Sequence, residues 1–320
     1  MRRNSLPQTG WIATVPGDRG KVSIKREIRQ AMKLQHPWLR FRAALGIGAF
    51  ALALCCGGDL RAAETPATLA PHRAVYDVTL AAARGGSGVS AVSGRIAYEL
   101  TGSACEGYTQ VMRFVTRMTN QSGGVTLTDL RSSTWEDGTA NRFRFDSSQY
   151  RDEKLGETTT GDAVRSGTGG DLKVDLTKPG KKRVTLPARV YFPMEHTITL
   201  IGAAKAGKTS LRANLFDGSE KGEKVYDTRA AIGRAQPPAE RKLAAVKDAE
   251  RLKGLRAWPV SIAYFEQGAG RSDALPVYEL AFLMFENGVS RRLHIDYGGF
   301  ALSGELREIT FHPPSRCERK

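Results

Sequence analysis

The chain has 320 residues, of which 41% are hydrophobic and 25% charged, and it carries a formal net charge of +15. These proportions are those of a globular protein, and they exclude collagen, full disorder and a polytopic membrane protein. A basic balance can indicate nucleic acid or a membrane surface as a partner. Here, however, residues 1–63 hold 11 basic and three acidic side chains, which leaves only +7 on the other 257 residues. We therefore expect no nucleic-acid partner.

Residues 1–63 are expected to be an N-terminal extension with a secretory signal peptide. An uncharged apolar run, 43–56, follows Arg40 and Arg42 and precedes small residues that end at Ala63. This is the order of a signal peptide, and the run is shorter than the roughly 20 residues that span a bilayer. The pattern predicts cleavage and export to the periplasm, with a retained anchor or a lipoprotein signal as alternatives.

Two methionines are candidates for the start of translation. Met32, followed by Lys33, would begin a signal peptide of ordinary length. The true start is therefore either Met1 or Met32.

Two cysteines remain after such cleavage, Cys105 and Cys317. In an oxidising compartment two cysteines favour one disulfide. The alternatives are two free thiols or a nucleophilic cysteine, which would need a histidine base nearby.

From His72 onward, apolar residues mostly alternate with polar ones, from the run Ala74–Leu80 to the run Leu293–Tyr297. Such alternation is typical of strands with one buried face. Turn pairs such as Asp137-Gly138 and Asn287-Gly288 separate the runs. The pattern predicts a single domain, residues 64–320, built as an antiparallel meander of about a dozen strands whose edges must be closed or covered.

Two segments depart from this alternation. Residues 237–253 are rich in helix formers, open with prolines and stop at Gly254, which predicts a surface helix. Residues 193–206 predict a second helix, because Pro193 suits its first turn, although the β-branched residues of the segment would also allow a strand.

Motifs for chemistry are weak. Gly202–Thr209 fits the phosphate-binding pattern G-x-x-x-x-G-K-[ST], but that loop needs a helix after it, and a short alternating run follows instead. We expect a helix end leading into a strand, with no nucleotide bound.

No serine lies in a nucleophile elbow, and the histidines lack the spacing of metal ligands. We expect no metal, no cofactor and no enzymatic activity. The four histidines in question are His72, His196, His294 and His312.

Several stretches of the chain resemble a known family. They are residues 71–76 (PHRAVY), 94–99 (GRIAYE), 101–108 (TGSACEGY), 192–196 (FPMEH), 204–207 (AKAG), 215–220 (LFDGSE) and 258–265 (WPVSIAYF). Together they resemble the EipB family of periplasmic cell-envelope integrity proteins, from about residue 69 to Cys317.

The resemblance implies a mostly β fold: a single strongly curved antiparallel sheet, a β-spiral or open barrel similar to lipoprotein-carrier folds, with about two helices. It also implies a non-enzymatic role in envelope integrity, a periplasmic tetratricopeptide-repeat partner and a disulfide between Cys105 and Cys317.

Two functions follow as expectations. The first is a periplasmic protein that supports outer-membrane integrity through a protein partner. The second is a carrier or chaperone that holds lipid or lipoprotein acyl chains in the concave face of the sheet. Nine apolar side chains are the candidate lining, unless they simply form the core. They are Tyr76, Tyr98, Met112, Phe114, Phe143, Phe145, Tyr264, Phe282 and Met284.

Overall fold

The computed structural model describes residues 68–167, 170–237, 243, 246–267, 275–313 and 315. The predicted extension and signal peptide, the alternative start at Met32, and Cys317 lie outside these residues. The described residues are mostly in strands, as the alternation predicts, with one α-helix, α1, over Pro193–Lys205.

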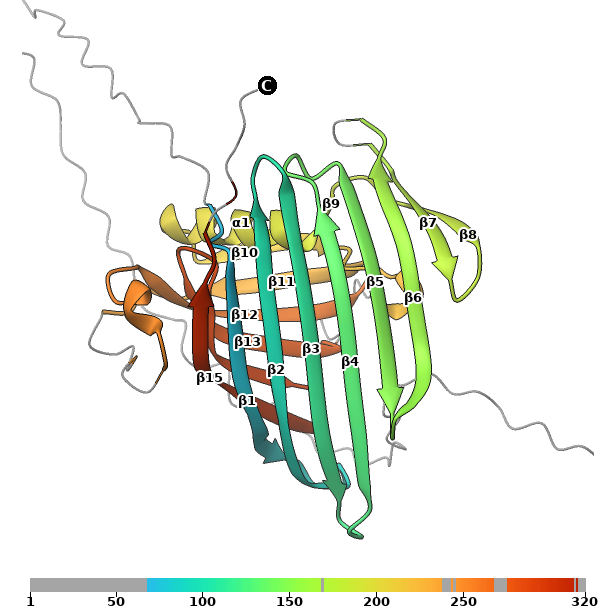
Figure 1. Cartoon of the computed structure of the whole chain (residues 1–320), viewed down its shortest axis with the longest axis vertical. Coiled ribbons are helices and arrows are strands. Elements are labelled where there is room, and N and C mark those ends of the chain that lie inside the picture. The colour runs from blue at the N-terminus through green and yellow to red at the C-terminus, as the bar shows by residue number, and fades with distance from the viewer. Residues whose placement is uncertain are drawn as a thin grey trace, which may run out of the picture. The chain divides into compact units, whose positions relative to one another are not determined.

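Fifteen strands in the described part of the chain form one continuous sheet (Figure 1). The order is β8-β7-β6-β5-β4-β3-β2-β1-β15-β14-β13-β12-β11-β10-β9, and every pair is antiparallel except β9 with β10. Turn pairs such as Asp137-Gly138 separate paired strands, which confirms the antiparallel meander. The strands are β1 His72–Ala83, β2 Val89–Ser103, β3 Gly107–Asn120, β4 Val125–Glu136, β5 Arg142–Arg151, β6 Lys154–Arg165, β7 Leu172–Lys178, β8 Lys182–Leu186, β9 Val190–Tyr191, β10 Ser210–Leu215, β11 Tyr226–Ile232, β12 Ala257–Glu266, β13 Tyr278–Phe285, β14 Ser290–Asp296 and β15 Phe300–Phe311.

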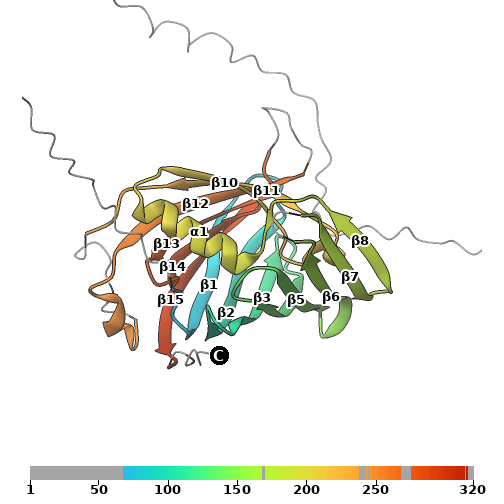
Figure 2. The same cartoon turned by 90° about the horizontal axis from the view of Figure 1, so that it is seen from above.

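The two edge strands of the sheet are adjacent in the chain. β8 ends at Leu186 and β9 begins at Val190, yet the two stand at opposite ends of the strand order. The four peptide steps between these residues span at most roughly 14 Å, so the sheet must curl until its edges approach each other. Figure 2 shows the strands curling in an arc with α1 in the hollow. The predicted single, strongly curved sheet is confirmed.

Helix α1 begins with Pro193 in its first turn and is followed by Gly207, whose φ is +71°. Proline suits a first turn because that turn leaves its N–H groups unbonded, and glycine tolerates the left-handed conformation that ends a helix. The buried face of α1, which includes Ile201, packs against Leu100 of β2 and Val260 of β12, from opposite sides of the curve. The helix predicted from Pro193 is confirmed.

The phosphate-binding pattern at Gly202–Thr209 spans the last turn of α1 and the turn before β10. In a phosphate-binding loop the helix follows the glycines and its N-terminus faces the phosphate. Here the helix precedes the pattern and a strand follows it. The local structure is therefore the helix end leading into a strand that the sequence predicts.

The predicted surface helix over residues 237–253 is wrong in the part of it that the structure describes. Asp248 has a left-handed φ of +61°, and Ala249–Leu252 form a 3₁₀ turn, η4. Helix propensity is a weak preference, and packing overrides it here. Leu243 and Val246 enter the core cluster formed by β1, β2 and β15. The described residues thus hold one α-helix with 3₁₀ turns, where about two helices are expected.

The segment around Lys247 lies beside β15 where the pairing of β14 with β15 ends. The two strands pair only over Leu293–Asp296. Beyond that point the N–H of Lys247 donates to the carbonyl of Arg307 at 2.9 Å, and the carbonyl of Lys247 accepts from the N–H of Ile309 at 3.1 Å. The segment therefore supplies backbone partners that β14 does not.

Phenylalanine side chains hold the two ends of the curved sheet together. Phe143 and Phe145 of β5 lie in one buried cluster with Phe192, which precedes α1, and Phe216, which follows β10. The ring centroids of Phe143 and Phe192 are 5.1 Å apart, and those of Phe145 and Phe216 are 5.6 Å apart. A Cβ at Gly218 would lie 2.5 Å from the ring of Phe145, so only glycine permits this approach.

We predict that acid destabilises the fold through His196 of α1. Burial lowers the pKa of His196 to about 4 from its ordinary 6.5. Between these values the unfolded chain binds a proton at this position and the folded chain does not, so stability falls as the pH drops from about 6.5 to 4. The difference between the two pKa values corresponds to about 3 kcal/mol.

The measurement is the free energy of unfolding in urea at pH 7 and pH 4, for the natural protein and for His196→Gln. All other titrating groups are common to both proteins, so the natural protein should lose about 3 kcal/mol more than the variant. Equal losses in the two proteins would contradict the prediction.

Candidate functional site

A buried carboxylate fixes α1 inside the curve of the sheet. Glu136, the last residue of β4, is 3% exposed. Its two oxygens accept the N–H groups of Met194 and Glu195, each at 2.8 Å. A negative group at a helix N-terminus satisfies donors that the helix cannot pair itself and interacts favourably with the helix dipole. Burial raises the pKa of Glu136 to about 8, and the two N–H bonds oppose that rise.

A second ion pair ties β6 to the same helix end. The Arg165 guanidinium contacts the Glu195 carboxylate at 3.0 Å and donates to the carbonyl of Val190 at 2.7 Å. The guanidinium also lies over the Phe192 ring, 4.8 Å from its centroid. One side chain of β6 therefore contacts β9 at the far edge of the sheet, the helix N-terminus and the phenylalanine cluster. Sequence reasoning did not identify this network, because its members are up to 59 residues apart.

Below α1 the concave face of the sheet is not covered by the helix. A helix of 13 residues is roughly 20 Å long and 10 Å wide, whereas the 15 residues of β2 extend over roughly 50 Å. Of the inward-facing side chains beyond the reach of α1, some are buried, such as Val78 at 1% and Val92 at 5% exposure, and others keep contact with solvent.

On one side of this uncovered surface the inward side chains are apolar. Cross-strand register places Phe114 beside Ile96, and Ile295 beside Leu302, on the face that carries α1. These positions are only partly buried. The apolar wall is defined here as Met112, Phe114, Met118, Leu293, Ile295 and Phe300.

On the other side, beyond Phe143 and Phe145, the inward side chains of β4 and β5 are mostly hydroxyls and amides. They lie on the same face as Glu136 and Phe143, since the two strands pair without a register shift. All of them keep some solvent exposure, and Leu130 interrupts the series. The hydroxyl wall is defined here as Thr126, Thr128, Ser132, Thr134, Ser147 and Gln149.

The nine side chains expected as a lining lie in three separate clusters. Phe143 and Phe145 belong to the cluster that holds the sheet ends. Tyr264 and Met284 are buried against α1, and Phe282 packs at the margin of that cluster. The other four belong to or border the cluster under β1, β2 and β15, where Tyr76 is buried while Tyr98, Met112 and Phe114 stay partly buried. Their role as a ligand lining stays a prediction.

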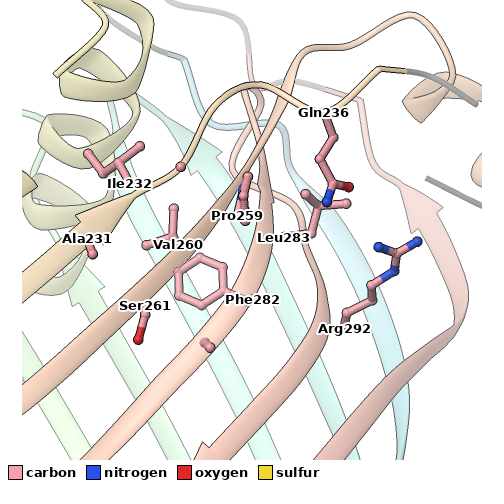
Figure 3. Close-up of a pocket in the computed structure, with 11 residues that line it drawn as sticks. Ala231, Ile232, Gln236, Pro259, Val260, Ser261, Phe282, Leu283 and Arg292 are labelled. Carbon is pink, nitrogen blue, oxygen red and sulfur yellow. The ribbon is translucent and has the colours of Figure 1, made fainter. Parts of the chain in front are cut away.

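The outer face of β11–β14 carries an open groove of about 510 Å³. Ala231 and Pro259 are exposed in it, while Val260 and Ile232 lie buried beneath. Figure 3 shows Ala231 on one side of this groove and Gln236 and Arg292 on the other. Small side chains make the strand surface flat here. No single residue in the sequence indicated the groove, because it needs three strands in register, with Ala231 opposite Ser261 and Ser261 opposite Ala281.

The remaining sequence candidates are dispersed. Cys105 lies in the turn between β2 and β3, where its N–H donates to the Ser103 hydroxyl at 3.3 Å. Its expected partner Cys317 lies outside the described residues, so the disulfide stays a prediction. In the described ranges, no group of three His, Cys, Asp or Glu side chains is placed to hold a metal ion. Within the same ranges, no helix has the length and apolar character needed to cross a membrane.

We predict that Glu136→Gln destabilises the protein by about 2 kcal/mol, because an amide keeps one acceptor and turns its NH₂ group against a backbone N–H. Urea unfolding at pH 9, above the pKa of about 8, compares the variant with an ionised carboxylate. Glu157→Gln, at an exposed position of β6, is the matched control and should change stability by less than about 0.5 kcal/mol. Similar losses in both variants would refute the anchoring role.

Comparison with known proteins places this chain and its fold in a family. The model of the EipB-like family matches residues 63–313. The cell envelope integrity protein EipB of Brucella abortus is 36% identical over 252 residues, which cover 78% of this chain and 87% of that protein. A crystal structure of a beta-barrel-like protein from Brucella abortus, described as a domain of unknown function, has a TM-score of 0.68 at 36% identity and covers 77% of this chain and 99% of its own. The chain therefore belongs to the EipB-like family.

Proposed function

We propose that this chain is a non-enzymatic periplasmic protein, exported by a cleaved signal peptide, that supports the integrity of the cell envelope at the outer membrane by binding a protein partner. One observation carries the proposal: the 36% identity, over 252 residues, to a protein named for cell envelope integrity. The curved sheet presents to such a partner an outer surface with an open groove on β11–β14.

The outer groove on β11–β14 is the surface that best suits the partner. It is apolar, about 510 Å³ in volume, and lies on the convex side of the sheet. Repeat proteins such as tetratricopeptide-repeat proteins present extended concave surfaces, which complement a convex strand face. A periplasmic tetratricopeptide-repeat protein, the partner that the family resemblance implies, therefore fits this groove.

We predict that Ala281→Arg, in the middle of the groove, weakens partner binding about tenfold and fails to restore detergent resistance to a strain that lacks the gene. A long charged side chain fills the groove and would be buried without a counter-charge. Ser133→Arg, at an exposed outward position of β4, is the control and should behave as the natural protein does. Pull-down of the repeat protein and plating on detergent measure the two effects. Full rescue and unchanged pull-down by Ala281→Arg would exclude this groove.

A second function, a carrier of lipid or lipoprotein acyl chains, is favoured by a different observation. The apolar wall faces the inside of the curved sheet, and its side chains stay partly exposed. Curved sheets of this size can enclose a ligand as well as a core. Native mass spectrometry of the purified protein should then show a co-purifying acyl lipid, and a spectrum with no adduct would speak against the carrier.

A further inference from the structure

The two walls of the concave face meet along one line, between β3 and β4. Met112 of β3 lies directly opposite Ser132 of β4, and Met118 lies opposite Thr126. On one side of the line the inward positions are mostly apolar, with Gln110 and Thr116 of β3 as exceptions, and on the other they are mostly hydroxyls. Buried cores contain few Ser and Thr side chains, and those they contain are hydrogen-bonded. A hydroxyl-rich inner surface beside an apolar one is therefore the lining expected for an amphiphile.

The hydroxyl wall carries almost no charge. From Thr126 to Thr134 on β4, and from Phe143 to Gln149 on β5, every inward position among the described residues is uncharged. The one carboxylate at the end of this row, Glu136, is bound to α1. Arg151 and Glu157 stand at the far end of the strands in register with Thr128 and Gln149, and their charges are opposite.

This lack of charge distinguishes between polar groups. A phosphate beside Ser132 and Thr134 would lose its hydration without an inward cation next to it, because Arg151 stands further along the strands, beside Thr128. A hydroxyl or amide group instead donates to and accepts from Ser, Thr and Gln side chains, which offer both kinds of atom. The chemistry of the wall therefore fits an uncharged head.

The apolar wall has the extent of a long acyl chain. Its two ends, on β14 and β3, are separated by β15, β1 and β2, and these four strand spacings amount to roughly 19 Å along the arc. An extended chain of this length would reach from Leu293 and Ile295 at one end to Met112 at the other, next to the hydroxyl wall. It would pass over the inward side chains of β15, β1 and β2, most of which are buried.

We propose that the concave face below α1 binds a neutral amphiphile, with one acyl chain on the apolar wall and an uncharged hydroxyl- or amide-bearing head on the hydroxyl wall. This inference rests on the carrier function proposed above and names its ligand class. It assigns Ser132 and Thr134 as the side chains nearest the boundary that recognise the head.

The test measures binding of three ligands with the same acyl chain to the purified full chain, by native mass spectrometry and titration calorimetry below the micelle concentration. The ligands are palmitoylglycerol (hydroxyl head), palmitoylethanolamide (amide head) and palmitoyl-lysophosphatidylglycerol (phosphate head). We expect one molecule of a neutral ligand per protein, bound about tenfold more tightly than the phosphate ligand. The first two arms distinguish a glyceride from an acylated amide as the natural source.

Variants locate the head. Ser132→Val and Thr134→Val remove hydroxyls from the inward face, and valine suits a strand. Ser133→Val makes the same change on the outward face of the same strand. We expect each inward variant to weaken the neutral ligand about fivefold and the outward variant to leave binding unchanged, with circular dichroism melting curves confirming that all three fold.

Each result decides a different claim. If the phosphate ligand binds as tightly as the neutral ones, the head assignment is wrong and the carrier function stands. If inward and outward variants lose affinity equally, the location on the hydroxyl wall is wrong. If none of the three ligands binds, the carrier function and this inference fail together.

Discussion

The contact between Phe145 and the loop that follows β10 holds the whole arrangement in place. In the described residues β8 pairs with β7 and β9 pairs with β10, so the sheet has two edges and side chains must hold them near each other. Gly218 and Gly222 allow the loop to lie against the Phe145 ring, where any side chain would collide. The aromatic cluster, together with the contacts of Arg165 to Val190 and Glu195, therefore holds the two edges near each other.

The position of helix α1 depends on the same contacts between the two edges of the sheet. Phe192 is both a member of the phenylalanine cluster and the residue that precedes the helix. Glu136 and Arg165 then bind the first turn from β4 and β6. These three contacts determine how deep α1 lies in the hollow, and hence how much of the concave face stays uncovered. The division of that uncovered face into an apolar and a hydroxyl wall follows from inward positions of β3 and β4 that lie side by side.

The strands, their turns and the helix at Pro193 were predictable because each leaves a local signal: alternation, a Gly-containing turn, or a proline before a helical run. The segment around Asp248 was not, because its composition favours a helix while its contacts with β15 are long-range. Glu136 carries no local signal, since its partners lie 58 and 59 residues later. Grouping aromatic residues by type also predicted one lining, whereas packing against Phe192 and Phe216 buries Phe143 and Phe145 away from the uncovered face.

One consequence of the strand order concerns the time course of folding. β1 pairs with β15, so residues at the start of the sheet bond to residues that follow more than 200 positions later. Pairings of such sequence separation form slowly, because the chain must lose a large loop entropy before they contribute stability. The first strand to leave the ribosome has one edge without its partner until the last strand is made. The sheet can therefore be completed only after β15 has been made.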